Sequence, residues 1–205
     1  MRIFLLSPAR ASGRRAQLLL RPEANFELAR RVQIGDATLG EVFAFCSGLY
    51  FRGKLDYARR FARPPVGVSG VQIITPSRGL QPPETRIGLN ELREFARVNV
   101  EATESDFVRP LQKSARILGV DQDCEVVLLG SIATGKYVEA LLPVFGERLL
   151  FPKEFVGRGD MSRGGLLLRC AAVGNELHYH RIEGSIRKGQ RATKIAAMTG
   201  PKRIE

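Results

Sequence analysis

Four short segments of this 205-residue sequence are rich in Ser, Gly and Arg: residues 7–10, 76–79, 130–137 and 152–164. Backbone N–H groups and guanidinium groups in such segments bind anions. The four segments supply most of the candidate nucleic-acid-binding residues, which are Ser7, Pro8, Tyr50, Ser77, Arg78, Gly79, Gly130, Ser131, Lys136, Tyr137, Arg158 and Ser162. The composition of these segments predicts a cleft lined for phosphate groups.

The segment around Asp160 has the residue types of an acid–base site. Arg158 and Arg163 flank this carboxylate and would keep it ionised, as a water-activating or sugar-cation-stabilising group requires. A nearby arginine would favour departure of an anionic leaving group. The candidate catalytic residues are therefore Asp160, Arg163 and Arg10. In an alternative interpretation, Asp160 caps a helix that begins near Ser162, and the arginines hold it there.

Two other patterns predict less. Residues 130–137, Gly-Ser-Ile-Ala-Thr-Gly-Lys-Tyr, match the GxxxxGK phosphate-binding loop, but Tyr137 occupies the position where Ser or Thr would hold magnesium. His178 and His180 alternate on an expected strand without a nearby cysteine or cluster of carboxylates, which favours a surface strand over a metal site. The sequence therefore predicts neither a metal nor a cofactor.

The elements that must position these segments alternate along the chain. Nearly continuous apolar runs at residues 2–6, 71–75, 125–129 and 148–151 are typical of strands buried on both faces of a parallel sheet. Helical periodicity occupies residues 22–33, 54–62, 89–98, 105–118 and 136–145, with Pro22 at the first helical position and Pro110 as an interruption. This order predicts an α/β fold, a three-layer α/β/α sandwich with a central, mainly parallel four-stranded sheet.

In such a sheet, ligands bind beyond the carboxyl ends of the strands, where all four Ser/Gly/Arg segments begin. Residues 161–172 could be helix or strand, and residues 176–182 alternate like an exposed strand. We expect a single domain over residues 1–183 and a basic tail over residues 184–205, either a solvated end or a phosphate-contacting arm.

The charge balance indicates the partner. The chain has 32 Lys and Arg against 21 Asp and Glu, a net charge of +11, which favours a polyanion because displaced counterions drive association. No apolar stretch approaches the roughly 20 residues of a membrane span, and the first residues do not resemble a signal peptide. Three cysteines without a CxxC pair suggest a reducing compartment. We expect a cytoplasmic, nucleic-acid-binding protein without a membrane partner.

A family resemblance follows from these segments. Residues 4–10, Phe-Leu-Leu-Ser-Pro-Ala-Arg, resemble the opening of the YaaA-type peroxide-stress proteins, in which a strand runs into Ser-Pro-Ala-Lys. Residues 45–50, 75–82, 127–137 and 158–163 resemble further motifs of that family in the same order, so the likeness covers about 160 residues. It implies DNA binding. Arg10 replaces the family's Lys, and a guanidinium does not supply a deprotonated amine.

The strand order also resembles the uracil-DNA-glycosylase-like superfamily, one branch of which is implied to remove modified cytosines from phage DNA. Ser7 and Pro8 stand where glycosylase motifs have a catalytic Asp or Asn. The first functional hypothesis is a DNA glycosylase-like enzyme of phage defence that binds double-stranded DNA and hydrolyses the N-glycosidic bond of a flipped, modified base, with Tyr50 or Tyr137 stacked on it. The alternatives are a non-catalytic DNA-binding stress-protection protein and, third, a nucleotide hydrolase.

Overall fold

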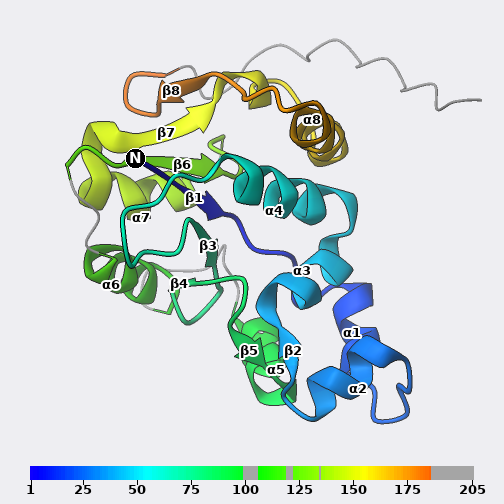
Figure 1. Cartoon of the computed structure of the whole chain (residues 1–205). Coiled ribbons are helices and arrows are strands. Elements are labelled where there is room, and N and C mark those ends of the chain that lie inside the picture. Colours follow the sequence, from blue (N-terminus) through cyan, green and yellow to red (C-terminus); the bar gives the residue numbers. More distant parts are fainter. Residues whose placement is uncertain (99–105, 119–121, 134, 186–205) are drawn as a thin grey trace, which may run out of the picture.

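A six-stranded, mainly parallel sheet forms the centre of the computed structural model, which describes residues 1–98, 106–118, 122–133 and 135–185. Strand β1 (Arg2–Leu6) pairs in parallel with β3 (Val71–Ile74) on one side and β6 (Glu125–Leu129) on the other. Strand β7 (Leu149–Pro152) extends the parallel part beyond β6. These are the four strands that the apolar runs predict (Figure 1).

The expected number of strands was too small. Two short antiparallel strands, β4 (Leu80–Gln81) and β8 (Tyr179–Arg181), close the edges and give the order β4-β3-β1-β6-β7-β8. Strand β4 does not form an apolar run in the sequence, because it has only two residues and follows a tight turn at Gly79, which has φ +65°. Strand β8 lies within the segment that alternates in the sequence.

Helices pack on both faces of the sheet because successive strand residues point to opposite sides. Phe4 and Leu6 belong to one buried cluster, and Ile3 and Leu5 to the other. The first side includes α1 (Arg14–Leu20), α2 (Glu27–Gln33), α3 (Leu39–Ser47), α4 (Leu49–Phe61), α5 (Leu89–Arg97) and α8 (Asp160–Val173). The second includes α6 (Val108–Ile117) and α7 (Lys136–Phe145). A mixed α/β protein with a mainly parallel sheet is therefore confirmed.

Shorter elements complete the fold. Strands β2 (Ala37–Thr38) and β5 (Arg86–Ile87) form a separate antiparallel pair beside α2 and α5 (Figure 1). Two 3₁₀ turns, Gly146–Arg148 and Lys153–Phe155, flank β7. None of the described helices is long and apolar enough to cross a membrane. Apart from Gly184 and Ser185, the expected basic tail lies outside the described residues.

Several predicted helix boundaries were wrong. Pro22 lies between α1 and α2 and does not start a helix, and α2 begins at Glu27. Helix α4 begins at Leu49 rather than at residue 54, directly after Gly48, which separates it from α3. Pro110 lies in the first turn of α6, where its missing N–H would have no helical partner, so it interrupts nothing.

The remaining helices follow the pattern closely. The helix predicted at residues 136–145 is confirmed, and residues 161–172 lie in α8. The helix predicted at 89–98 is α5, which ends one residue earlier. Position 105, the predicted start of the helix before β6, lies outside the described residues.

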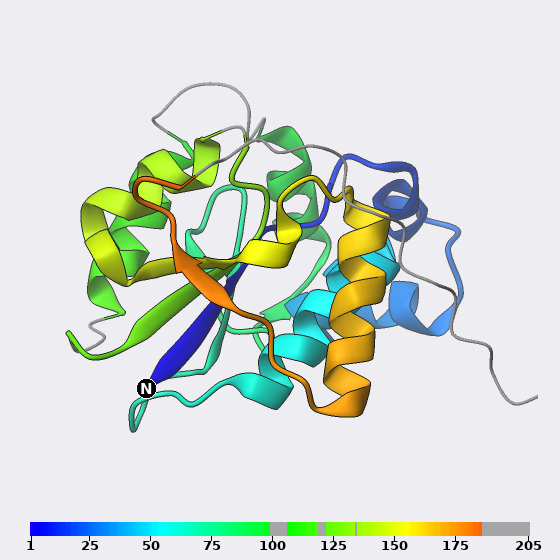
Figure 2. The same cartoon turned by 90° about the horizontal axis from the view of Figure 1, so that it is seen from above.

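Helices α4 and α8 approach each other unusually closely at two glycines. A Cβ on Gly164 would lie 2.8 Å from the Cα of Tyr50, and one on Gly53 would lie 2.7 Å from the carbonyl oxygen of Gly164. Only glycine permits this distance, since real Cβ atoms do not approach a backbone so closely. Figure 2 shows α8 running alongside α4 on one side of the sheet. The contact brings side chains at the start of both helices into one region.

Candidate functional site

A cavity of about 550 Å³ opens where β1 ends. The chain leaves β1 towards β3 on one side and returns to β6 on the other, so the loops after β1 and β6 diverge at a topological switch point. The cavity is lined by Pro8, Ala9, Arg10, Ala11, Ser12, Pro76, Phe95, Ala96, Arg97, Val98, Lys136 and Tyr137. We call it the cationic pocket because these described lining residues include three cations and no carboxylate.

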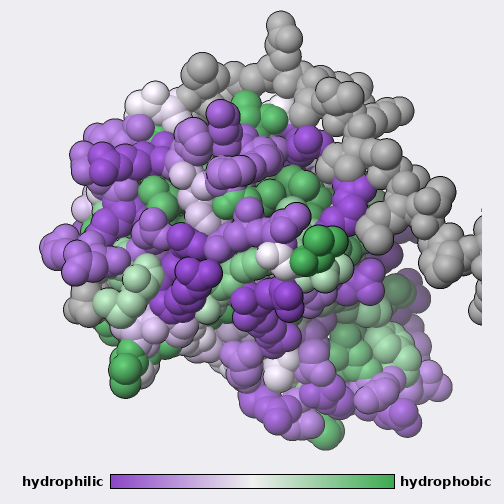
Figure 3. Space-filling model, turned by 45° about the horizontal axis from the view of Figure 1, so that its top comes forward, coloured by the Kyte–Doolittle hydropathy of each residue, from purple (hydrophilic) through white to green (hydrophobic). Residues whose placement is uncertain are grey.

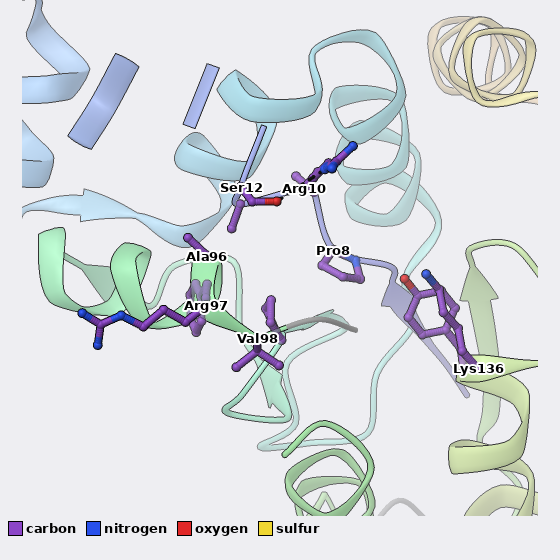
Figure 4. Close-up of a pocket in the computed structure, with 12 residues that line it drawn as sticks. Pro8, Arg10, Ser12, Ala96, Arg97, Val98 and Lys136 are labelled. Atoms are coloured by element: carbon purple, nitrogen blue, oxygen red, sulfur yellow. Dashed lines mark hydrogen bonds between the residues drawn. The ribbon is translucent and has the colours of Figure 1, made fainter. Parts of the chain in front are cut away.

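The cations of the pocket come from different elements. Arg10 belongs to the loop after β1, is exposed, and its Nε donates to Ser12 Oγ at 3.4 Å. Lys136 is the first residue of α7. Figure 4 shows Arg10 and Lys136 on either side of Pro8, whereas Arg97 extends away from Lys136. Within the part of the chain that the structure describes, Arg10 and Lys136 form no ion pair, so both charges are available to an anion.

Beside this pocket lies a buried amine. Lys54, on α4, is 1% exposed, and its Nζ donates to the Ser7 carbonyl oxygen at 2.6 Å and to Ser7 Oγ at 2.9 Å. The rings of Tyr50 and Phe51 lie 4.5 and 4.9 Å from the same nitrogen. We call Ser7, Tyr50, Lys54, Asp160 and Arg163 the buried lysine cluster.

Burial lowers the pKa of Lys54 to about 7, because desolvation penalises its charged form. The negative charge of Asp160 raises this pKa, and the positive charge of Arg163 lowers it further. Burial also raises the pKa of Tyr50 to about 12, while the charge of Arg163 opposes that rise. The Tyr50 hydroxyl is buried, and Arg163 is the charged residue that acts on it most strongly.

The two charged residues from α8 differ in exposure. The Arg163 side chain is 12% exposed, donates from Nε and Nη2 to the Phe155 carbonyl oxygen at 3.3 and 3.0 Å, and lies 3.7 Å from Asp160 Oδ1. The Asp160 side chain is 71% exposed. Asp160 is the first residue of α8 and does not cap it through its side chain; Gly159 occupies the N-cap. The capping alternative was therefore wrong in detail, although a carboxylate in the first turn still favours the helix dipole.

The neighbouring predicted residues shape these loops. Arg158 donates to the Glu154 carbonyl oxygen at 2.9 Å and to Ser162 Oγ at 3.2 Å, which braces the segment before α8. Gly130 allows the loop after β6 to pass close to β1, because a Cβ there would lie 3.0 Å from that of Ser7. Ser131 Oγ accepts from the Ala133 N–H at 3.4 Å. Of these side chains, none lines the cationic pocket.

Of the segment after β3, Pro76 lines the cationic pocket, whereas Ser77, Arg78 and Gly79 do not. The Arg78 guanidinium binds Glu94 at 2.6 Å and Glu91 at 3.4 Å, and Ser77 Oγ donates to Glu94. A Cβ on Gly79 would collide with the carbonyl oxygen of Pro110 in α6. These residues hold α5 and α6 against the edge of the sheet, and Arg78 is already neutralised.

The other two sequence patterns have local roles. The buried Tyr137 ring packs edge-on against Phe107, with centroids 6.0 Å apart. His178 Nδ1 lies 3.0 Å from Glu154 Oε1. The described residues contain no group of three His, Cys, Asp or Glu side chains that could hold a metal ion.

Sequence reasoning missed Lys54 and Arg97. Tyr50, Lys54, Tyr57 and Phe61 are spaced by four, three and four residues and form one buried stripe of α4. A lysine within an apolar helical stripe was therefore a signal available in the sequence. The structure divides the predicted set: Pro8, Arg10, Lys136 and Tyr137 line the cationic pocket, whereas Ser7, Tyr50, Asp160 and Arg163 lie in the buried lysine cluster.

Comparison with protein-family models, with curated proteins and with solved structures found no match to this chain.

Proposed function

We propose that this protein binds double-stranded DNA and holds a backbone phosphate in the cationic pocket. The observation that carries the proposal is that Arg10, from the loop after β1, and Lys136, from the start of α7, line one pocket at the switch point of the sheet, with no carboxylate among the described lining residues. A phosphate would supply the missing negative charge, and Lys136 starts α7, whose N-terminus also favours an anion.

The rest of the molecule supports a polyanionic partner. The chain has a net charge of +11, so counterion release favours binding to a phosphate backbone. In Figure 3, hydrophilic side chains cover most of the face in view, and hydrophobic areas are small and scattered. The resemblance to the YaaA-type proteins also implies DNA binding. Together these features favour contact with the DNA backbone over an apolar protein interface.

Fluorescence anisotropy with a short labelled duplex at several salt concentrations tests the proposal. We expect Arg10→Ala/Lys136→Ala to lower affinity about 10- to 100-fold at fixed salt and to reduce the slope of log K against log salt by about 2. Arg109→Ala/Lys113→Ala, on exposed positions of α6, removes the same charge and should bind within about threefold of wild type. Wild-type binding by the pocket variant would reject the assignment.

Base excision is the second candidate function, and one observation favours it. Asp160 is an exposed carboxylate that follows β7 at the carboxyl edge of the sheet, and its charge acts on the buried Lys54. In a three-layer, uracil-DNA-glycosylase-like arrangement, Asp160 would activate water or stabilise the sugar cation, and Arg163 or Arg10 would favour departure of an anionic base. Tyr50 and Tyr137 are 7% and 5% exposed, so stacking on a flipped base would require the first turns of α4 and α7 to move.

The test of excision uses duplexes with ordinary and hypermodified cytosines and measures abasic sites. Asp160→Asn should remove product and keep DNA affinity, whereas Asp56→Asn, on the exposed side of α4, should keep both. If no member of the panel yields abasic sites, the protein acts as a non-catalytic DNA binder.

Nucleotide hydrolysis stays a third prediction. Lys136 and the helix N-terminus could hold a phosphate, but the buried Tyr137 ring occupies the position of the magnesium-binding hydroxyl. Magnesium-dependent ATP binding that is lost in Lys136→Ala would support it.

A further inference from the structure

Lys54 is a buried amine, and no carboxylate of the described residues is in hydrogen-bond contact with it. Ser7 faces it from the position directly after β1, Tyr50 and Phe51 from α4, and Asp160 and Arg163 from α8. Asp160, the one carboxylate of this group, is largely exposed and shares its charge with Arg163 at 3.7 Å. The surroundings therefore favour the neutral amine, which has a lone pair and can accept a proton.

The hydroxyl of Ser7 is the group placed to give up that proton. Its Oγ lies 2.9 Å from Lys54 Nζ, within the range for a nucleophile and its base. The Ser7 carbonyl oxygen accepts from the same amine at 2.6 Å and fixes its position. The contact between Ser7 Oγ and the Leu129 carbonyl oxygen is longer, at 3.3 Å, and competes weakly for the hydroxyl proton. Nucleophile, base and orienting group are therefore present together.

Ser7 is buried, with 6% of its surface exposed, and lies directly beside the cationic pocket. Ser7 is the residue after β1, and the next residue, Pro8, lines the cationic pocket. A molecule that places a phosphate between Arg10 and Lys136 would bring its other end towards the carboxyl end of β1. We propose that Ser7 and Lys54 form a serine–lysine nucleophile–base pair that hydrolyses a carboxylic ester whose alcohol portion carries a phosphate group. This activity goes beyond DNA binding and does not depend on it.

The reaction balances with water as the only co-reactant. Ser7 Oγ attacks the ester carbonyl carbon while its proton moves to the neutral Lys54 amine. The bond to the alcohol oxygen breaks, and this oxygen takes the proton from the Lys54 ammonium as the alcohol departs. Water then attacks the acyl-Ser7 ester, with its proton passing through Lys54 back to Ser7 Oγ. The products are a carboxylic acid and the phosphorylated alcohol.

Labelling by a fluorophosphonate probe, with the adduct located by mass spectrometry, tests the proposal. The wild-type protein should carry the adduct on Ser7, and Ser7→Ala should carry none. Labelling of Lys54→Met and Lys54→Arg should be slowed by about 100-fold or more, since neither side chain accepts the proton. Ser69→Ala and Lys113→Met, before β3 and on α6, are matched controls that should label like wild type.

The pH dependence separates a base from a structural contact and needs no Lys54 variant. Labelling of the wild-type protein should rise from pH 6 to pH 8 as Lys54, with its pKa of about 7, loses its proton, and should then level off. Inorganic phosphate should slow labelling of the wild type and have less effect on Arg10→Ala/Lys136→Ala. Absence of a Ser7 adduct in folded protein between pH 6 and 9, or a wild-type labelling rate in folded Lys54→Met, would overturn the proposal. DNA affinity, measured separately, decides the proposed function in either case.

Discussion

The buried lysine cluster and the cationic pocket lie one residue apart at the end of β1, yet they treat positive charge in opposite ways. In the cluster, Lys54 is 1% exposed and is held by an uncharged serine and two aromatic rings. In the pocket, the Arg10 side chain is open to solvent. Neither Lys54 nor Arg10 forms an ion pair among the described residues, and the main difference between them is solvation.

This difference decides the chemistry of each region. A cation in water keeps its charge at little cost, so the pocket can exchange small counterions for a phosphate. A buried cation without a partner loses its proton instead, which makes Lys54 a candidate base and a poor anion ligand. Neighbouring residues with the same charge can therefore serve binding in one place and proton transfer in the other.

The largest expected effect concerns the packing of α4 on α8, which holds the buried lysine cluster together. Gly164→Ala should lower the free energy of unfolding by about 2–3 kcal/mol, because its Cβ would lie 2.8 Å from the Tyr50 Cα. Gly165→Ala is the matched control: nothing lies within 4 Å of a Cβ there, so helix propensity should raise stability by about 0.5–1 kcal/mol. Urea denaturation measures both. Equal effects at the two glycines would contradict the close helix contact.

The next effect tests the protonation of Lys54. Because its pKa is lowered from 10.5 to about 7 in the folded protein, the unfolded chain binds more protons between these values, and stability should rise with pH there. Relative to Lys54→Met, the wild-type protein should gain about 2 kcal/mol between pH 7 and pH 9. Below pH 7 the two should run parallel. A constant difference from pH 6 to pH 9 would show that Lys54 does not change its proton affinity on folding.

The smallest effect is expected at Arg78. It tests whether an arginine that is already paired with carboxylates contributes to DNA affinity. Its guanidinium is paired with Glu91 and Glu94, so Arg78→Ala should change DNA affinity by less than about threefold and lower stability by less than about 1 kcal/mol. Anisotropy and urea denaturation measure these changes beside Arg10→Ala. A loss of affinity at Arg78 equal to that at Arg10 would extend the DNA-binding surface to the loop after β3.

The sequence predicts the fold correctly where a strand is buried on both faces or where a helix keeps a regular hydrophobic period. The four central strands are continuous apolar runs, and residues 136–145 keep one helical period between two glycines, so both were predicted correctly. The short edge strands form only because they pair with neighbouring strands, and β4, with two residues, is too short to give a pattern in the sequence. The break between α3 and α4 depends on Gly48, whose backbone conformation is not encoded by hydrophobic periodicity.

For the candidate site, the sequence by itself determined which loops gather at the carboxyl edge and that their charge is positive. Strand order and composition are enough for both conclusions. Only the tertiary structure decided which charges are neutralised: Arg78 meets two glutamates from α5, Arg163 meets a backbone carbonyl, and Lys54 meets Ser7 across 47 positions of sequence. Solvation and pairing depend on contacts between distant segments, and these contacts set the charge state of each group.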